Sequence, residues 1–295
     1  MYAAQAAARA TAVNNAFYVP ATGGYYDTMQ THIVMPLSCG VVPKAQEGKV
    51  MAALERQFLA NDSHVDVGLT GNYFLTRLLT GDTLDIDRPS EGYQRNDLMM
   101  ALTNQTTAPG YGFFLSQGYT TWPEDWAAPK NGYEHEVSRC KAQQTESKGA
   151  GAISKMHGCY NAIGLWFVQG VAGITVDAAA PYVLTVRAGV DAGSLTWAKG
   201  QRAALGASGG VLSSWSLEGS GFAHNVTVPV GSIAKVMIPV ASSINEVTES
   251  GKPVASATGV TVLGEGMASV VNRDQFVSFE VGSGEYLFAS KWRRK

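Results

Sequence analysis

The spacing of hydrophobic residues divides the chain into two regions. Up to residue 175 apolar side chains recur every three or four positions, which is typical of helices, and from residue 177 onward they alternate, which is typical of strands. The clearest amphipathic segment predicts a helix over residues 45–60. Its buried face is predicted to carry Val50, Met51, Leu54, Phe58 and Leu59. Further helices are predicted over residues 2–17, 28–39, 72–79, 91–103 and 157–171.

Local signals refine two of these helices. Asp27 is predicted to be the N-cap of the helix over 28–39, and Pro36 is predicted to kink it. Residues 128–155 are polar and show little periodicity, which predicts a long surface loop of the kind that often carries function. The helix over 157–171 is predicted to place on one side Ile163, Trp166, Phe167 and Val171.

Short alternating segments separated by glycine-rich turns fill the C-terminal region. The strands are predicted over residues 182–187, 194–202, 211–217, 222–230, 233–240, 276–281 and 285–288. Many short strands with a turn about every ten residues indicate an antiparallel β-sandwich. We therefore expect two domains, a helical one over residues 1–175 and a β-sandwich over residues 176–295.

The composition excludes several classes of protein. With 45% hydrophobic residues in 295, the chain has enough apolar surface for packed cores and is not a disordered chain. A formal charge of −2 argues against binding nucleic acid, and no apolar run is long enough for a membrane-spanning helix. Three cysteines are too few for a disulfide scaffold. The alanine-rich N-terminus is typical of a helix rather than a signal peptide, and the localisation stays open.

The segment from Gly118 to Trp126 holds the strongest candidate for catalysis. It places two carboxylates, Glu124 and Asp125, between Trp122 and Trp126. Indoles beside a carboxylate form a dry wall that raises its pKa, and they also stack on sugar rings. In the alternative interpretation, the two tryptophans only fill the core.

His157 is a second candidate, at the start of the last predicted helix. A lone histidine is more often a hydrogen-bonded structural residue than a catalytic one. Together with His135, Cys140 and Cys159 it suggests a metal site, but the spacings match no closed zinc pattern.

Six motifs, taken in order, resemble glycoside hydrolase family 78, the α-L-rhamnosidases. The resemblance covers about residues 10–290 and no single motif is decisive. The motifs are Gln30-Thr31 with Cys39–Pro43, His64–Gly68 with Thr70-Gly71, Thr120–Trp126, the set His157, Gly164 and Trp166, Glu249–Pro253, and Phe279–Gly284.

This resemblance implies a fold and a mechanism. The implied fold is part of an (α/α)6 toroid, as in six-hairpin glycosidases, followed by an antiparallel β-sandwich. The implied reaction is inverting hydrolysis of terminal α-L-rhamnosides, with Glu124 as the general base, His157 as a sugar contact, and Trp122 and Trp126 as walls of the sugar site. It requires neither a metal nor an organic cofactor.

The sequence also departs from the family pattern. The general acid of the family lies in a Gln-Arg-Asp-Glu-Arg-x-Gly-Trp motif, which this chain lacks, so we expect either a fragment or a chain completed by a partner. Asp125 replaces the arginine that follows the base, and Asn161 replaces a glycine. Either Asp125 or Glu134 is a candidate to support the base. Two alternatives stay open: a non-catalytic sugar-binding or structural remnant, and a lyase acting on rhamnose linked to a uronic acid.

Overall fold

The computed structural model describes residues 2–27, 29–81, 93–124, 126, 156–177, 179–203, 209–267 and 275–293. Within these residues, 2–78 and 98–163 form one compact unit, and 79–81, 93–97 and 164–293 form a second.

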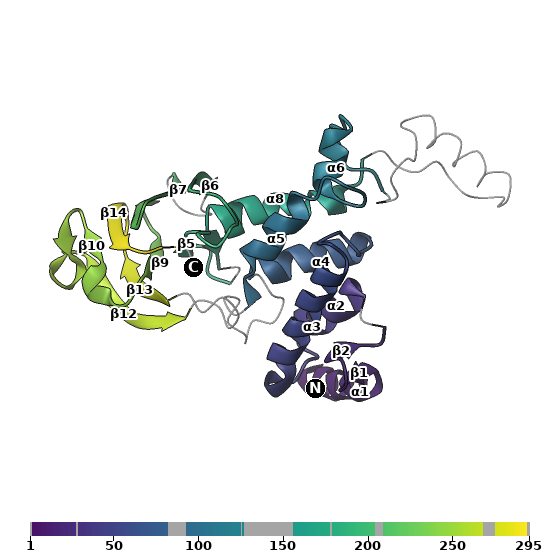
Figure 1. The fold of residues 1–295 in the computed structure, drawn as a ribbon. Helices are drawn as coiled ribbons and strands as arrows, with labels where there is room; N and C mark the ends of the chain where they lie inside the picture. The colour runs from purple at the N-terminus through teal and green to yellow at the C-terminus, as the bar shows by residue number, and fades with distance from the viewer. Residues whose placement is uncertain are drawn as a thin grey trace, which may run out of the picture. The chain divides into compact units, whose positions relative to one another are not determined.

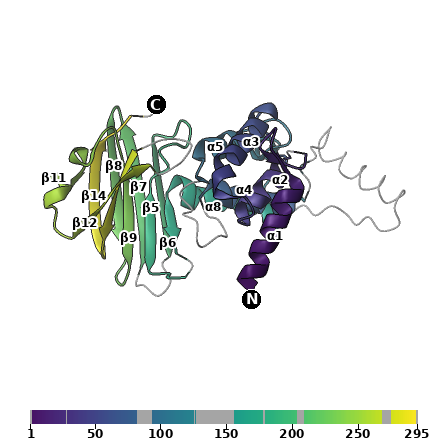
Figure 2. The same ribbon diagram turned by 90° about the horizontal axis from the view of Figure 1, so that it is seen from below.

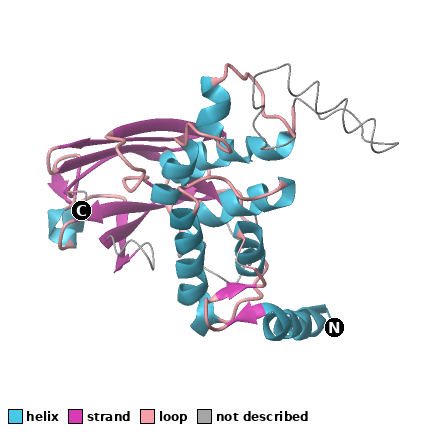
Figure 3. Ribbon diagram, turned by 45° about the vertical axis from the view of Figure 1, so that its right-hand side comes forward, coloured by secondary structure: helices cyan, strands magenta, loops and turns pink. Residues whose placement is uncertain are grey.

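The first unit is built from helices. They are α1 (Tyr2–Phe17), α2 (Gln30–Ser38), α3 (Glu47–Ala60), α4 (Leu69–Leu79), α5 (Asn96–Thr103) and α6 (Tyr111–Ser116), with a 3-10 turn, η1, over Lys44–Gln46. A two-stranded antiparallel sheet, β1 (Tyr18–Val19) with β2 (Gly24–Tyr25), follows α1 and was not predicted. It lies beside α1 at the N-terminal end of the chain (Figures 1 and 3).

The apolar residues of α3 form its buried face as predicted, except for one. Val50, Met51, Leu54 and Phe58 are buried as predicted, and α3 packs against α2. Leu59 is 68% exposed instead of buried. It follows Val50 by nine positions, and at about 100° per residue this places the two side chains on opposite sides of the helix.

Three helix starts differ from the prediction. The N-cap of α2 is Met29 rather than Asp27, whose carboxylate instead accepts the N–H of Met29 (3.1 Å) and contacts the His32 ring. Helix α4 begins at Leu69, three residues early, and α5 begins only at Asn96.

The segment after His157 is helical but not one regular α-helix. It runs through a 3-10 turn, η3 (Gly158–Ala162), a single α-turn, α8 (Ile163–Leu165), and a π-helical turn, η4 (Trp166–Val171). A π-turn holds more residues than an α-turn and breaks the 3.6-residue periodicity. Phe167 is therefore 51% exposed, whereas Ile163, Trp166 and Val171 are buried as predicted.

The second unit is a β-sandwich. Its six-stranded sheet has the order β11-β10-β14-β8-β7-β6 and its five-stranded sheet the order β12-β13-β9-β5-β4. The strands, several of which run side by side in Figure 2, are β4 (Ile174–Val176), β5 (Val183–Arg187), β6 (Trp197–Ala203), β7 (Gly210–Glu218), β8 (Gly221–Val228), β9 (Ile233–Val240), β10 (Thr248–Glu249), β11 (Lys252–Pro253), β12 (Val260–Met267), β13 (Gln275–Val281) and β14 (Gly284–Lys291).

Inward-facing residues of the two sheets meet in one core. Phe279 on β13 stacks on Phe288 on β14, with centroids 5.6 Å apart, and Ser290 donates to the carbonyl of Pro239. Among the described strands of the sandwich, every pair is antiparallel except β5 with β9, which is parallel. The sequence did not predict β4, β10, β11 or β12, which are short or lack a clean alternation.

A buried polar network lies in the second unit, to which the first two residues of α5, Asn96 and Asp97, also belong. The indole N–H of Trp166 donates to Asn96 Oδ1 (2.9 Å), and Asn96 Nδ2 donates to Asp191 Oδ1 (2.8 Å). Asp191 Oδ2 lies 3.7 Å from the Arg187 guanidinium, which also covers the Phe276 ring. Both charged side chains are more than nine-tenths buried, so each depends on the other for compensation.

A buried histidine occupies the sandwich core. Ser213 Oγ lies 2.6 Å from the Ala172 carbonyl oxygen and 2.8 Å from His224 Nε2. Since the hydroxyl gives its one proton to the carbonyl, Nε2–H must donate to Oγ, and the imidazole is neutral. Among the described residues Nδ1 has no hydrogen-bond partner, and burial lowers the pKa of His224 to about 3.

Candidate active site

Two segments of the first unit form the candidate site. One is the loop that leaves α6, which turns at Gly118 with φ of +77°, a conformation that favours glycine, and continues to Glu124. The other begins at Met156 and enters η3. Helix α6 was not predicted, because six residues are too few to show a period.

Tyr111 on α6 joins the two segments. Its hydroxyl donates to the carbonyl of Tyr160 (3.0 Å) and lies 3.1 Å from Asn72 Oδ1 on α4. Its ring, which is only 1% exposed, meets the indoles of Trp122 and Trp126 edge-on, each at 5.0 Å. Tyr111 therefore fixes both tryptophans from the core side.

The two tryptophans have different environments. Trp126 is 8% exposed and packs against Tyr160 at 4.3 Å and Phe114 at 5.9 Å, which agrees with the core-filling interpretation. Within the described part of the chain, its indole N–H has no acceptor. Trp122 is half-buried and keeps part of its ring in contact with solvent.

Glu124 and His157 lie on neighbouring pieces of backbone. The N–H of His157 donates to the carbonyl of Trp122 (2.7 Å), and the Tyr160 hydroxyl donates to the carbonyl of Glu124 (3.2 Å). The His157 ring is half-buried, 6.2 Å from that of Tyr160. Glu124 itself is exposed, so its carboxylate is not enclosed between the indoles in the described residues, contrary to expectation.

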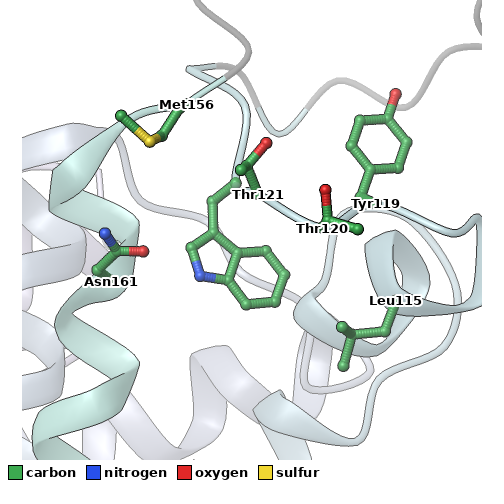
Figure 4. Close-up of a pocket in the computed structure, with 7 residues that line it drawn as sticks. Leu115, Tyr119, Thr120, Thr121, Met156 and Asn161 are labelled. Atoms are coloured by element: carbon green, nitrogen blue, oxygen red, sulfur yellow. The ribbon is translucent and has the colours of Figure 1, made fainter.

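A pocket of about 310 Å³ opens between the two segments (Figure 4). Asn161 from η3 and Leu115 from α6 lie on opposite sides, and the Asn161 amide points towards the middle. The lining residues are Leu115, Tyr119, Thr120, Thr121, Trp122, Met156 and Asn161. Of the predicted site residues, only Trp122 belongs to this lining.

Several other candidates lie outside the described residues. These are Asp125, Glu134, His135, Cys140, the side chain of Cys159 and the predicted loop over 128–155. Within the residues that are described, no group of three or more His, Cys, Asp and Glu side chains is placed to hold a metal ion. None of the described helices has both the length and the apolar character needed to cross a membrane.

Two of the family-like motifs pack against one another. Gln30 is fully buried, donates to the His64 carbonyl and accepts the N–H of Asp66, both at 2.9 Å. A Cβ at Gly71 would meet the Thr31 hydroxyl and the Val67 side chain, so a larger residue here forces these side chains to shift. The structure thus gives Gln30, Thr31 and Gly71 a role in packing.

The model of the bacterial α-L-rhamnosidase six-hairpin glycosidase domain matches residues 1–171. The chain belongs to this family. The α-L-rhamnosidase of Streptomyces avermitilis is 28% identical over 287 residues, which cover 94% of this chain and 23% of that protein. This chain therefore spans about a quarter of the length of that relative.

Solved structures establish the same fold for this family member. The crystal structure of the Streptomyces avermitilis α-L-rhamnosidase complexed with L-rhamnose aligns with a TM-score of 0.71 at 24% identity, over 96% of this chain and 23% of that one. The α-L-rhamnosidase from Dictyoglumus thermophilum gives a TM-score of 0.71 at 22% identity, over 96% and 27%. The family, and the arrangement of a helical region followed by a β-sandwich, are confirmed.

Proposed function

We propose that this chain carries the general-base half of the active site of an inverting α-L-rhamnosidase. The supporting observation is that the family match over residues 1–171 contains both Glu124 and His157, and that hydrogen bonds join their segments across more than thirty residues of sequence. The relatives that the chain matches are α-L-rhamnosidases. The substrate we propose is accordingly a glycoside or polysaccharide with terminal α-L-rhamnose.

Each side chain has a distinct part in this proposal. Glu124 removes a proton from the attacking water, which reaches it readily because the side chain is exposed. His157 contacts the sugar, and Trp122 offers its ring as a wall of the sugar site. Trp126 is too deeply buried for a wall and instead positions Tyr160, whose hydroxyl holds the Glu124 backbone.

The general acid comes from outside these 295 residues in our proposal, because the chain lacks the acidic motif of the family. In an inverting enzyme the two carboxyl groups stand about 6.5–9.5 Å apart, with water between one of them and the sugar. A further segment or partner that completes the helical toroid supplies that acid. None of the residues of α1 is buried, and this bare helix is one surface where such a segment can pack. Residues 1–175 are then part of the catalytic domain and 176–295 its β-sandwich.

The test is stereochemical. The full-length gene product and this chain are each incubated with an aryl α-L-rhamnoside, and the first-formed sugar is followed by proton NMR. We expect β-L-rhamnose from the full-length product and no turnover by the chain alone. Initial release of α-L-rhamnose contradicts inversion, and no turnover by the full-length product favours the non-catalytic remnant. Ultraviolet absorption from an unsaturated uronic residue, formed from a rhamnose–uronate substrate, favours the lyase.

A further inference from the structure

The outward face of the six-stranded sheet is left open by the described residues. On β7 and β8 the side chains that point into the sandwich core, such as those of Trp215 and His224, alternate with side chains that point away from it. None of the residues on β6, β7, β8 and β14 that point away from the core is buried. This face of the second unit is therefore a surface on which a large ligand can lie.

Trp197, the first residue of β6, distinguishes this face from an ordinary solvated one. The residue is 67% exposed, although a tryptophan that packs against other side chains buries roughly 150–250 Å² of surface. Its cross-strand partner is Ser216 on β7, and the next residue in the same row is Ala223 on β8. Because both neighbours are small, they leave the indole available to a ligand.

A lysine lies beside this indole. Lys199 follows Trp197 by two residues on β6, so both side chains leave the same face of the sheet, with their Cα atoms roughly 7 Å apart. Lys199 is exposed, and it forms no ion pair with a carboxylate of the described residues. Glu218 on the same face lies on the other side of Trp197, because it follows Ser216 by two residues.

An amide continues the row of Lys199 across the sheet. Lys199 pairs with Ser214 on β7, which in turn pairs with Asn225 on β8, so the three side chains stand in one row. Neighbouring strands lie about 4.8 Å apart, which places the backbone of Asn225 roughly 10 Å from that of Lys199. Asn225 is exposed. One extended ligand can therefore contact the indole, the ammonium group and the amide together.

We propose that this face binds an acidic polysaccharide, with Trp197 against the C–H face of one sugar ring and Lys199 paired with the carboxylate of a uronic acid residue. The Asn225 amide, which has both donors and an acceptor, bonds to hydroxyl groups of the chain. Charge decides the class of polysaccharide, because a neutral chain leaves the Lys199 ammonium without a partner. An open face admits the interior of a long chain. The inference goes beyond the proposed function and does not depend on the role of Glu124.

The experiment compares two polymers that share one backbone and differ in charge. Binding of the 295-residue chain to polygalacturonate, and to the same polymer with its carboxylates methyl-esterified, is measured by affinity electrophoresis and calorimetry. Trp197→Ala and Lys199→Gln each change one exposed side chain of the face, and circular dichroism checks that the fold is kept. Tyr182→Ala is the matched control for the indole, because Tyr182 is 54% exposed but precedes β5 in the other sheet.

The free chain should bind polygalacturonate more tightly than the ester, by about the same two- to fivefold that Lys199→Gln costs, because each change removes one exposed ion pair. Lys199→Gln should leave the Kd for the ester unchanged. Trp197→Ala should raise the Kd for both polymers about tenfold or more, as for the loss of an aromatic anchor. Glu218→Gln and Tyr182→Ala should not weaken binding. At roughly 1 M salt, where the Debye length is about 3 Å, the difference between the two polymers should largely disappear.

Three results would overturn the inference. They are no binding of polygalacturonate, equal binding of the two polymers at low salt, and an unchanged Kd in Trp197→Ala or Lys199→Gln. Since β6 is an edge strand of its sheet among the described strands, an unchanged Kd together with self-association of Lys199→Gln would assign the lysine to protection of that edge. Turnover of an aryl α-L-rhamnoside by the full-length product tests the proposed function separately, so either proposal can fail while the other stands.

Discussion

Acidification should destabilise the β-sandwich through His224. In the folded chain His224 is fully buried, its Nε2–H is bonded to Ser213 Oγ, and its pKa is lowered to about 3 by desolvation. In the unfolded chain its pKa returns to about 6.5. Between these two values the unfolded state binds a proton that the folded state does not, so the free energy of unfolding falls as the pH decreases.

The size of this effect follows from the two pKa values. Below about pH 6.5, each further decrease of one pH unit lowers the free energy of unfolding by about 1.4 kcal/mol, until the pH approaches 3. At pH 4.5 the loss is therefore roughly 3 kcal/mol, and near pH 3 it approaches about 5 kcal/mol. Above pH 7 the contribution disappears because His224 is neutral in both states.

The assay is urea unfolding, followed by the circular dichroism of the strands, at several pH values between 7.5 and 4. His224→Leu should flatten the pH dependence by about one proton per molecule relative to the unsubstituted chain. Ser213→Ala is the control: it removes the acceptor of Nε2–H and lowers stability at every pH, but leaves the slope in place. Carboxylates such as Asp27, whose pKa is lowered by its bond to His32, contribute equally to all three proteins. Equal slopes for His224→Leu and the unsubstituted chain would refute the reasoning.

Three substitutions test the packing by thermal or urea unfolding. Gly173→Ala places a Cβ against the Arg187 carbonyl oxygen at a φ of +81° and should lower the free energy of unfolding by at least about 3 kcal/mol. Its control, Gly219→Ala, has a φ of +61° but lies in open space and should lower it by only about 1 kcal/mol. Similar losses for the two variants would contradict the collision at Gly173. Asp191→Ala leaves the Arg187 cation buried without its partner and should lower the free energy of unfolding by about 3–5 kcal/mol. A loss below about 1 kcal/mol would contradict a buried ion pair. Gln30→Leu removes the two side-chain hydrogen bonds to the backbone of residues 64 and 66 and should lower the free energy of unfolding by about 2–3 kcal/mol. An unchanged free energy of unfolding would mean that water replaces these two hydrogen bonds.

Much of the fold can be predicted from the periodicity of apolar residues, and the predictions that fail do so for local reasons. Residues with a strong pattern, such as Val50, Leu54 and Phe58, are buried as predicted. Leu59 is apolar, which is why the pattern includes it, but its angular position around the helix axis places it opposite Val50. Phe167 was misplaced because nothing in the sequence marks the π-turn. Strands such as β12 were missed because Gly264 and Gly266 interrupt their alternation.

The candidate site was harder to predict because it depends on contacts between distant segments. The local sequence made Glu124 and His157 candidates and the family resemblance implied their roles, but neither indicated that Tyr111 and Tyr160 hold their backbones together. The environments of the two tryptophans also depend on tertiary packing: Trp126 is buried against Tyr160, whereas Trp122 is half-buried. The same packing leaves Glu124 exposed. His224 carried no signal in the sequence, since a strand pattern does not distinguish a buried histidine from an exposed one.

The central claim, that Glu124 is the general base, is tested most directly by the turnover number of the full-length gene product carrying Glu124→Gln. The amide keeps the shape of the exposed side chain but cannot take a proton from water, so kcat on an aryl α-L-rhamnoside should fall about 10²- to 10⁴-fold with unchanged unfolding behaviour. Glu218→Gln, at an exposed position at the end of β7, is the matched control and should retain full activity. A Glu124→Gln enzyme that keeps nearly the unsubstituted kcat would remove Glu124 from the mechanism.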